Sequence, residues 1–302
     1  MKDNLQQEIT WLLNEKYGGR LSGAAERDIT RLKKGEPVDY VIGYKNFCGC
    51  KIDLRYRPLI PREETEFWVE RAVRDTFLRT AGKPSELAAL MSSPRSSASR
   101  RTPCPLGSGC SQKSIPNRFS IIKCLDIFAG SGCCGIAVLK NIPNSHCDFC
   151  DIDDNCLKQT RLNLKINKIP ASRYRIIKSN IFYSLPTACY SLILANPPYI
   201  AFAQKNKVQK SVLSFEPKNA LFAKNNGLYF IEKFLRGAKN YLAPGGVIYL
   251  EFGYNQKKDI EKLLREFNYK NFEFHRDQFG KWRWLEITNN QDTSIQTNSN
   301  NQ

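Results

Sequence analysis

The stretch LDIFAGSGCCG, residues 125–135, decides the fold that we predict for this chain. An apolar run ends in an acid, and a loop with three glycines then leads into the next segment. Glycine allows the backbone to turn sharply and to lie close to a ligand. The letters match G-x-G-x-x-G, which is typical of a strand–turn–helix unit at a dinucleotide site, although a plain tight turn gives the same pattern.

On both sides of this unit, short apolar runs alternate with amphipathic segments. We predict helices at 133–141, 154–167, 226–243 and 256–267, and strands at 121–127, 146–151, 174–178, 190–195, 246–252, 271–275 and 281–287. Such an alternation indicates an α/β fold with a mainly parallel sheet that helices cover on both faces. Ligands of these sheets bind beyond the carboxyl ends of the strands, so the strand ends are the places to search for a site.

Composition divides the chain into four segments. Residues 1–80 read as a small, mostly helical N-terminal domain with a short hairpin at 47–56, and 119–288 hold the strand–helix alternation. Residues 81–118 hold nine Ser, five Pro and six basic residues against one acid, which predicts a disordered basic linker or insertion. The polar segment 289–302 reads as a disordered tail.

The net charge and the cysteine content limit which partners and which cellular compartment we expect. A net charge of +17 favours a nucleic acid, an acidic protein or a ribosome-associated partner, but it also serves general solubility. We find no secretory signal and no apolar run long enough for a membrane span, so we expect a cytoplasmic protein with its 11 cysteines reduced. Cys147 and Cys150 form a CxxC without a second pair, so we expect no metal.

A second strand end carries acids. In CDFCDIDDN, residues 147–155, Asp151 follows Gly135 by 16 residues, where a carboxylate can bind both hydroxyls of a ribose. Asp153 and Asp154 instead suit the start of the next helix, as caps and as partners of its positive end. Asp151 is therefore the candidate for ribose binding.

A third strand end, LILANPPYI at 192–200, stops in an amide, two prolines and an aromatic ring. Proline donates no backbone hydrogen bond, so Pro197 and Pro198 cannot continue a sheet, and an ordinary Pro-Pro turn is the simplest explanation. Methyl transfer to a planar nitrogen gives these residues a role. Its delocalised lone pair makes such a nitrogen a poor nucleophile, and two oxygen acceptors can hold both of its N–H groups in line with the donor.

The Asn196 side-chain oxygen and the Pro197 carbonyl are suitable acceptors, and they also stabilise the positive charge that the nitrogen gains. Tyr199 can stack on the substrate plane. We therefore predict Asn196, Pro197 and Tyr199 as the catalytic residues. No general base is required before attack, because the proton leaves after the nitrogen has become cationic.

Together these strand ends resemble the class I S-adenosylmethionine-dependent methyltransferases. More narrowly, the segments GEPVDYVIG (35–43), LIPREETE (59–66), FEPKNALFAKNNGL (215–228) and LAPGGVIYLEFGYNQ (242–256) resemble the peptide chain release factor glutamine methyltransferases over almost the whole chain. The resemblance implies a Rossmann-like, seven-stranded sheet whose last strand is antiparallel, and substrate recognition by the N-terminal domain. It also implies methylation of the glutamine in the Gly-Gly-Gln loop of a release factor by a monomeric enzyme.

The same resemblance assigns residues to the two ligands. The cofactor, S-adenosylmethionine, is expected to contact Asp126, Phe128, Gly130, Gly132, Asp151, Ile152, Asn180 and Asn196. The substrate is expected to contact Asn196, Pro197, Pro198, Tyr199 and Glu216, while Arg62 and Glu66 are candidates to brace the junction between the domains.

The chain departs from the family pattern at several positions. Asn180 stands where Asp usually faces the adenine amino group, which predicts weaker cofactor binding because an amide oxygen still accepts that hydrogen bond. Glu63 replaces a usual Pro, Ser191 a common Asp, and the family normally lacks the 81–118 insertion. None of these changes removes a residue that the chemistry requires.

Three alternatives remain open. A glutamine of a ribosomal protein is the nearest rival substrate. The adenine amino group of DNA or RNA suits the NPPY stretch and the net charge equally well, but we find no separate target-recognition domain. A non-catalytic binding module on the same fold is the third alternative, and the intact strand ends argue against it.

Overall fold

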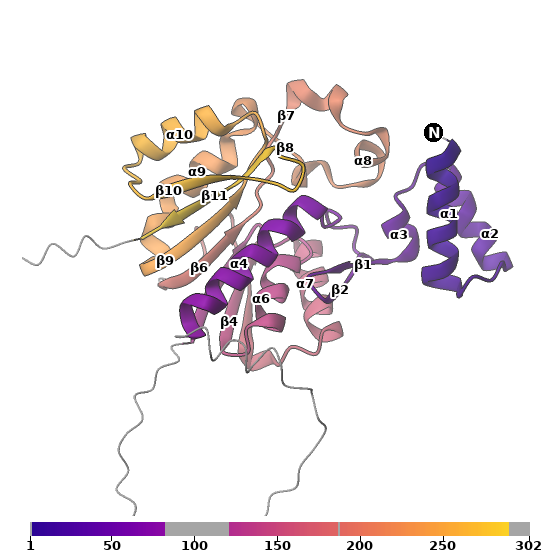
Figure 1. The fold of residues 1–302 in the computed structure, drawn as a ribbon, viewed down its shortest axis with the longest axis horizontal. Coiled ribbons are helices and arrows are strands. Elements are labelled where there is room, and N and C mark those ends of the chain that lie inside the picture. Colours follow the sequence, from indigo (N-terminus) through magenta and orange to yellow (C-terminus); the bar gives the residue numbers. More distant parts are fainter. Residues whose placement is uncertain (1, 82–120, 187, 290–302) are drawn as a thin grey trace, which may run out of the picture.

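The computed structural model describes residues 2–81, 121–186 and 188–289 (Figure 1). Its centre is a seven-stranded sheet in the order β10-β11-β9-β6-β3-β4-β5. The strands are β3 (Ile122–Ile127), β4 (Ser145–Asp151), β5 (Tyr174–Lys178), β6 (Tyr190–Ala195), β9 (Leu242–Glu251), β10 (Phe272–Arg276) and β11 (Trp282–Thr288). In this sheet β11 is antiparallel to both of its neighbours, whereas the pairs from β9 to β5 are parallel. The predicted seven-stranded, mainly parallel sheet with an antiparallel last strand is confirmed.

Helices connect these strands where the sequence predicts them. They are α6 (Cys133–Asn141), α7 (Asp154–Ile166), α9 (Tyr229–Ala238) and α10 (Lys257–Glu266). α9 is shorter than the predicted 226–243, because 3₁₀ turns at Asn225–Gly227 and Lys239–Tyr241 flank it. Asn226 and Gly227 both have positive φ, which an α-helix does not accommodate.

Different helices cover the two faces of the sheet. Successive side chains of a strand point to opposite faces, so Cys124 and Leu125 of β3 enter separate cores. Cys124 lies in a buried cluster that α4 (Glu63–Ala81), α6 and α7 help to form, and Leu125 lies in a second cluster with α9 and α10. Burial on both faces explains why the strands read as continuous apolar runs.

The first three helices form a unit of their own at the right of Figure 1. They are α1 (Lys2–Tyr17), α2 (Gly23–Lys33) and α3 (Val38–Ile42). Their apolar side chains make a separate cluster around Leu12, Leu32 and Val41. The Ser22 hydroxyl accepts the Ala25 N–H at 3.2 Å, as expected for the cap of α2.

The hairpin and α4 pack on the sheet instead of on these helices. The hairpin strands are β1 (Tyr44–Phe47) and β2 (Cys50–Asp53). Phe47 and Ile52 of the hairpin and Trp68 of α4 share one buried cluster with sheet residues. Residues 2–42 thus contribute most of a cluster of their own, while Tyr40 of α3 joins the sheet cluster and Tyr44 of β1 packs on the helical one. The expected linker and tail fall almost entirely on 82–120 and 290–302, outside the described residues.

Side-chain amides of α7 hold the free edge of the hairpin. The Lys51 N–H donates to Asn167 Oδ1 at 3.1 Å, and Asn167 Nδ2 donates back to the Lys51 carbonyl at 2.9 Å. The Asp53 N–H donates to Asn163 Oδ1 at 2.9 Å. Two buried asparagines thus pair with the backbone groups of β2 that a neighbouring strand would otherwise pair with, and they attach the hairpin to α7.

An excursion after β6 lies beyond the carboxyl end of the sheet. It contains β7 (Ile200–Ala201), α8 (Lys210–Phe215), β8 (Phe222–Ala223) and 3₁₀ turns at Phe202–Lys207 and Lys218–Ala220. Outside this segment, the connection from α7 to β5 also contains a 3₁₀ turn, Ala171–Arg173. β7 and β8 pair in a small parallel sheet of their own, which returns the chain to α9 (Figure 1).

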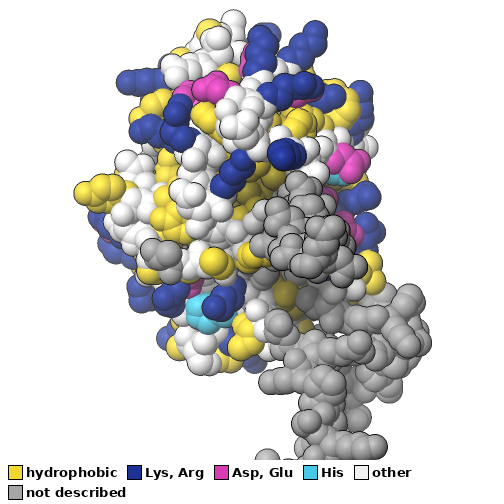
Figure 2. Space-filling model, turned by 90° about the vertical axis from the view of Figure 1, so that its left-hand side faces the viewer, with side chains coloured by type: hydrophobic (Ala, Val, Ile, Leu, Met, Phe, Trp, Pro, Cys, Tyr) yellow, Lys and Arg dark blue, Asp and Glu magenta, His cyan; other side chains and the backbone are white. Residues whose placement is uncertain are grey.

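The surface is basic at many places. Figure 2 shows Lys and Arg side chains at several separate positions on one face, interspersed with hydrophobic and uncharged side chains. On that face the charge does not mark out one binding surface. Within the described residues, no helix has the length and apolar character that a bilayer crossing requires.

Candidate active site

A cavity of about 360 Å³ lies at the carboxyl ends of the parallel strands. Its size falls in the usual range for small-molecule sites. The loops after β3, β4, β5 and β6 line it, and so do residues 59–62 and Thr65, which join the hairpin to α4. The three strand ends that the sequence singled out therefore meet at one cavity.

The glycine loop after β3 forms one wall. Gly130 lines the cavity with φ +54°, and Gly132 begins α6 with φ +76°. A Cβ at Gly132 would lie 2.9 Å from the Thr160 methyl carbon of α7, closer than packed carbon atoms approach. The Thr160 hydroxyl in turn donates to the Gly130 carbonyl at 3.2 Å. The glycines therefore allow the loop to turn between the sheet and α7.

Asp126 lies beneath this loop and is not among the residues that line the cavity. Its carboxylate accepts the Gly135 N–H at 2.8 Å at the start of α6. Burial raises the pKa of Asp126 to about 8, and nearby Asp151 adds to the effect. We expected a direct contact between Asp126 and the cofactor, whereas the structure gives this side chain a role in holding the loop.

Asp151 lies at the end of β4 and lines the cavity. Its two oxygens accept the N–H groups of Gly130 and Asp153 at 2.8 and 2.9 Å. A carboxylate has about four acceptor positions, so acceptor capacity remains for a ligand hydroxyl. Burial raises its pKa above the ordinary value of an aspartate. Asp153 caps α7 through the Asn155 N–H at 2.8 Å, as predicted.

Apolar side chains and one free amide form the far wall. Phe128, Ile152 and Ile181 line the cavity, and Ile152 is 58% exposed. Phe128 and Ile181 have φ of +65° and +54°, and such left-handed geometry in bulky residues concentrates at functional sites. The side chain of Asn180, for which we predict a role as a cofactor ligand, is exposed and lines the same cavity.

Four thiols also face this cavity, from Cys133, Cys134, Cys150 and Cys156. Burial raises the pKa of the Cys150 thiol to about 12, and it raises that of Cys156 as well. The pKa of Cys134 is raised by its contact with the Cys133 thiol and by burial. The thiols of Cys134, Cys150 and Cys156 are therefore protonated at neutral pH and behave as small apolar side chains.

Asn196 and Pro198 follow β6 and line the cavity, as Thr65 of α4 does. The Asn196 amide nitrogen donates to the Thr65 hydroxyl at 3.3 Å. Within the described part of the chain, no side chain donates a hydrogen bond to its amide oxygen, which is therefore the acceptor left for a ligand. Pro197 is buried between the two and does not line the cavity. We expected Pro197 to contact the substrate, whereas this structure keeps the residue outside the cavity lining.

Tyr199 lies behind the cavity wall, not in it. Its hydroxyl donates to Glu251 at 2.9 Å, and its carbonyl accepts the Gln256 amide at the same distance. Burial raises the pKa of Tyr199, and the negative charge of Glu251 adds to this effect. We expected its ring to stack on the substrate, but in this structure the ring is held by contacts within the protein.

Glu216, expected near the substrate, is buried at the junction between the hairpin region and the excursion. Its carboxylate accepts the Ile60 N–H at 3.1 Å and pairs with Arg62 at 2.6 Å. Glu216 is also outside the cavity lining, whereas its partners Ile60 and Arg62 belong to that lining. Glu216, in the excursion after β6, therefore holds the 59–62 segment in place at the cavity.

Sequence reasoning missed two polar residues behind Asn196. Thr65 and Glu251 are almost fully buried, and the Thr65 hydroxyl donates to Glu251 at 2.7 Å. Burial raises the pKa of Glu251, while hydrogen bonds from Trp68 and Thr65 oppose the shift. A glutamate that directly ends the apolar run VIYL was the available signal, because such a position predicts a buried carboxylate.

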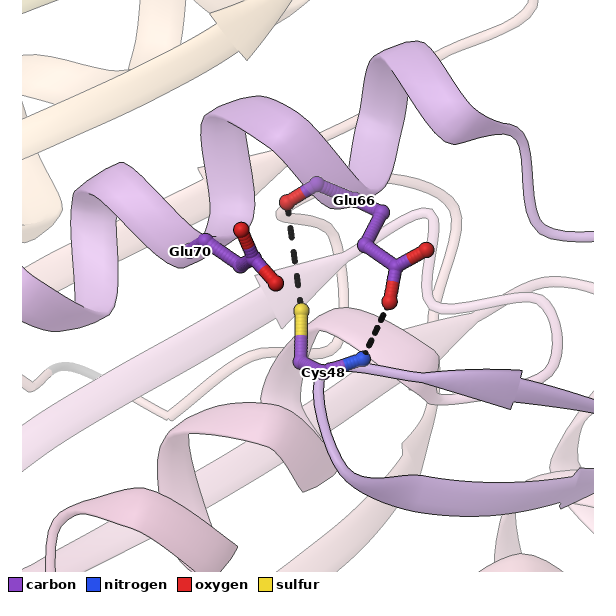
Figure 3. Close-up of side chains that lie close together, drawn as sticks. All are labelled: Cys48, Glu66 and Glu70. Carbon is purple, nitrogen blue, oxygen red and sulfur yellow. Dashed lines mark hydrogen bonds between the residues drawn. The ribbon is translucent and has the colours of Figure 1, made fainter.

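A group with metal-ligating atoms lies away from this cavity. Cys48, Glu66 and Glu70 bring a thiol and two carboxylates within 4.8 Å of one another (Figure 3). Glu66 already accepts the Cys48 N–H at 2.6 Å, and the thiol contacts the Glu66 carbonyl. Burial and both carboxylates raise the pKa of Cys48, which keeps the thiol protonated. The group joins the hairpin turn to α4.

Comparisons with known proteins agree with this geometry. Residues 111–221 match the family model of the methyltransferase small domain. By its backbone the chain is similar to the hMettl16 catalytic domain in complex with MAT2A 3′UTR hairpin 6. That match has a TM-score of 0.54 and 15% identity, over 81% of this chain and 77% of the other, which supports the fold alone.

Sequence relatives are more specific. The bifunctional methyltransferase of Rickettsia conorii (strain ATCC VR-613 / Malish 7) is 28% identical over 90% of this chain, which spans about half (48%) of that longer protein. The release factor glutamine methyltransferase of Lactococcus lactis subsp. lactis (strain IL1403) is 30% identical over 258 residues, 85% of this chain and 79% of the relative. The chain therefore belongs to the release factor glutamine methyltransferase family.

Proposed function

We propose that this protein transfers a methyl group from S-adenosylmethionine to the side-chain amide nitrogen of a glutamine. The substrate would be the glutamine in the Gly-Gly-Gln loop of a peptide chain release factor. One observation carries the proposal: Asn196 lines the same cavity as the glycine loop and Asp151, with its amide nitrogen turned to Thr65. The amide oxygen is then the group available to a substrate that offers N–H donors.

The cavity fits the cofactor in volume and in chemistry. Asp151 has acceptor capacity left for a ribose hydroxyl, and the exposed Asn180 amide can meet the adenine edge. Ile152 and Phe128 offer apolar surface for a planar base. When bound there, S-adenosylmethionine would supply an electrophilic methyl carbon.

The chain's own contribution is to hold and orient the amide. The Asn196 oxygen would accept one N–H group at the cavity wall. The Pro197 carbonyl, outside the lining in this structure, would accept the other once substrate binding exposes it, and the two contacts would fix the nitrogen in one position. The same oxygens would stabilise the positive charge that develops as the nitrogen becomes tetrahedral. Because its proton leaves afterwards, the site needs no strong base, and none of the residues that line the cavity is a histidine.

A panel of substrates tests the proposal. Purified enzyme and S-adenosylmethionine with a labelled methyl group are incubated separately with a release factor, a ribosomal protein and duplex DNA. We expect label in the release factor only. The matched control is the same release factor with its loop glutamine replaced by alanine, which should stay unlabelled. Label in the DNA or the ribosomal protein, but not in the release factor, would contradict the assignment.

A further inference from the structure

We infer that Thr65 and Glu251 are positioning residues that fix which end of the Asn196 amide faces the substrate. The inference rests on the proposed function for the identity of the substrate, but its geometry belongs to the protein alone. An asparagine amide has two ends of nearly equal size, and a flip exchanges an acceptor for a donor. If the nitrogen faced the cavity, it would oppose the N–H groups of the substrate instead of binding them.

Thr65 selects the orientation because its hydroxyl has only one proton. That proton is donated to Glu251 Oε2 at 2.7 Å. The Thr65 oxygen can then only accept, and it does so from the Asn196 amide nitrogen at 3.3 Å. The reverse orientation would place the Asn196 oxygen against another lone pair. Donation to Glu251 therefore directs the Asn196 oxygen toward the cavity.

Glu251 is held as an acceptor by its other neighbours. The Trp68 indole nitrogen, which can only donate, lies 2.7 Å from the same oxygen, Oε2. The Tyr199 hydroxyl donates to Oε1 at 2.9 Å, and it accepts from Arg283 at 3.4 Å. Because Arg283 can only donate, the Tyr199 proton points to Glu251. Each neighbour of the carboxylate therefore imposes the same direction on the network.

The network connects segments that are far apart in the sequence. Thr65 and Trp68 lie in α4, Tyr199 follows β6, Glu251 ends β9 and Arg283 lies in β11. Thr65, Trp68 and Glu251 are each at most 2% exposed, so water does not compete for these hydrogen bonds. The orientation of Asn196 thus depends on the docking of α4 against the sheet.

Substitution of Thr65 tests the inference in solution. In Thr65→Val the side chain keeps its shape but cannot accept, so both amide orientations become accessible. We expect kcat for a glutamine loop peptide to fall by roughly tenfold or more, the equivalent of one lost hydrogen bond. The affinity for S-adenosylmethionine should stay within about twofold of wild type, and Thr65→Ser should restore most of the lost rate. An unchanged kcat in Thr65→Val, or no rescue by Thr65→Ser, would overturn the inference.

A neutron crystal structure of the wild-type protein in D₂O separates this inference from the proposed function. We expect deuterons on the Asn196 nitrogen that point to Thr65, and the Thr65 deuteron directed at Glu251. An Asn196 oxygen facing Thr65 would overturn the inference whatever the substrate proves to be. A protein with the expected deuterons that leaves release factor unmethylated would refute the proposed function and support the positioning network.

Discussion

A single amide side chain links the structure to the proposed chemistry. Asn196 follows an apolar strand, and the two prolines after it end that strand at the cavity. Its place at the cavity was predictable from sequence, because an amide and two prolines at a strand end are informative locally. The partners of neighbouring Tyr199 were not, since Glu251 lies 52 residues away along the chain.

We predict that Asn196→Ala lowers methyl transfer by roughly two orders of magnitude or more, because one of the two acceptors for the substrate amide is lost. The affinity for S-adenosylmethionine should change little. Single-turnover rates and calorimetric titration measure the two quantities. Asn206→Ala, at an exposed position outside the cavity lining, is the matched control. A loss of cofactor affinity with the rate retained would show that Asn196 does not hold the substrate.

Asp126 gives a prediction for the pH dependence of stability. Its pKa of about 8 lies above the ordinary aspartate value, so the folded protein keeps a proton that the unfolded chain has lost. Its contribution to stability is fully present below pH about 4 and is lost as pH rises through about 8. Between these limits this group lowers the free energy of unfolding by roughly 1 kcal/mol per pH unit.

Asp126→Asn removes this titration and keeps an acceptor for the Gly135 N–H. We expect the stability of the variant, relative to wild type, to rise steadily from pH 5.5 to pH 7.5 in denaturant titrations. The comparison cancels the contributions of groups that titrate in both proteins. A constant difference across this range would mean that Asp126 is ionised throughout.

The unit from β3 through the glycine loop to α6 shows why some elements were predictable. Its strand, turn and helix are specified by consecutive residues, and the predicted helix 133–141 matches α6. The hairpin was predicted as an element, but its place on the sheet, and that of α4, was not. That placement depends on distant contacts such as the one between Lys51 and Asn167.

The glycine loop supplies a test of packing within this unit. Gly132 and Gly245 both have positive φ, but a Cβ at Gly132 would meet Thr160 at 2.9 Å, whereas nothing lies within 4 Å of one at exposed Gly245. We expect Gly245→Ala to lose about 1–2 kcal/mol of stability from backbone strain alone. Gly132→Ala should lose about 1–3 kcal/mol more through the clash. Equal losses in denaturant titrations would show that the loop relaxes freely.

The assembled protein builds the cavity from two segments that are far apart in the sequence. Residues 59–65 contribute one part of the lining and the strand ends another, and the ion pair between Arg62 and the buried Glu216 joins them. Sequence alone pointed to the strand ends as the site, and the resemblance marked 59–66 as the junction between the domains. It did not reveal that Glu216 braces the junction, because burial of that carboxylate depends on contacts across about half of the chain.

The insertion offers a test of this division. We predict that deletion of 84–115 leaves methyl transfer to a short glutamine-containing loop peptide nearly intact, because the cavity is lined by residues 59–65 and 127–230. The kcat and KM of the deletion variant measure this directly, with its melting temperature as a control for folding. An inactive variant with an unchanged melting temperature would give the insertion a direct part in catalysis.

The central claim is that two fixed oxygens present a planar amide to the methyl donor. A crystal structure of the protein with S-adenosylhomocysteine and a glutamine-containing loop peptide tests it most directly. We predict that the glutamine side-chain nitrogen lies within hydrogen-bond distance of both Asn196 Oδ1 and the Pro197 carbonyl, and faces the cofactor sulfur. A peptide bound with its glutamine elsewhere, or a cofactor sulfur turned away from residues 196–199, would contradict the account.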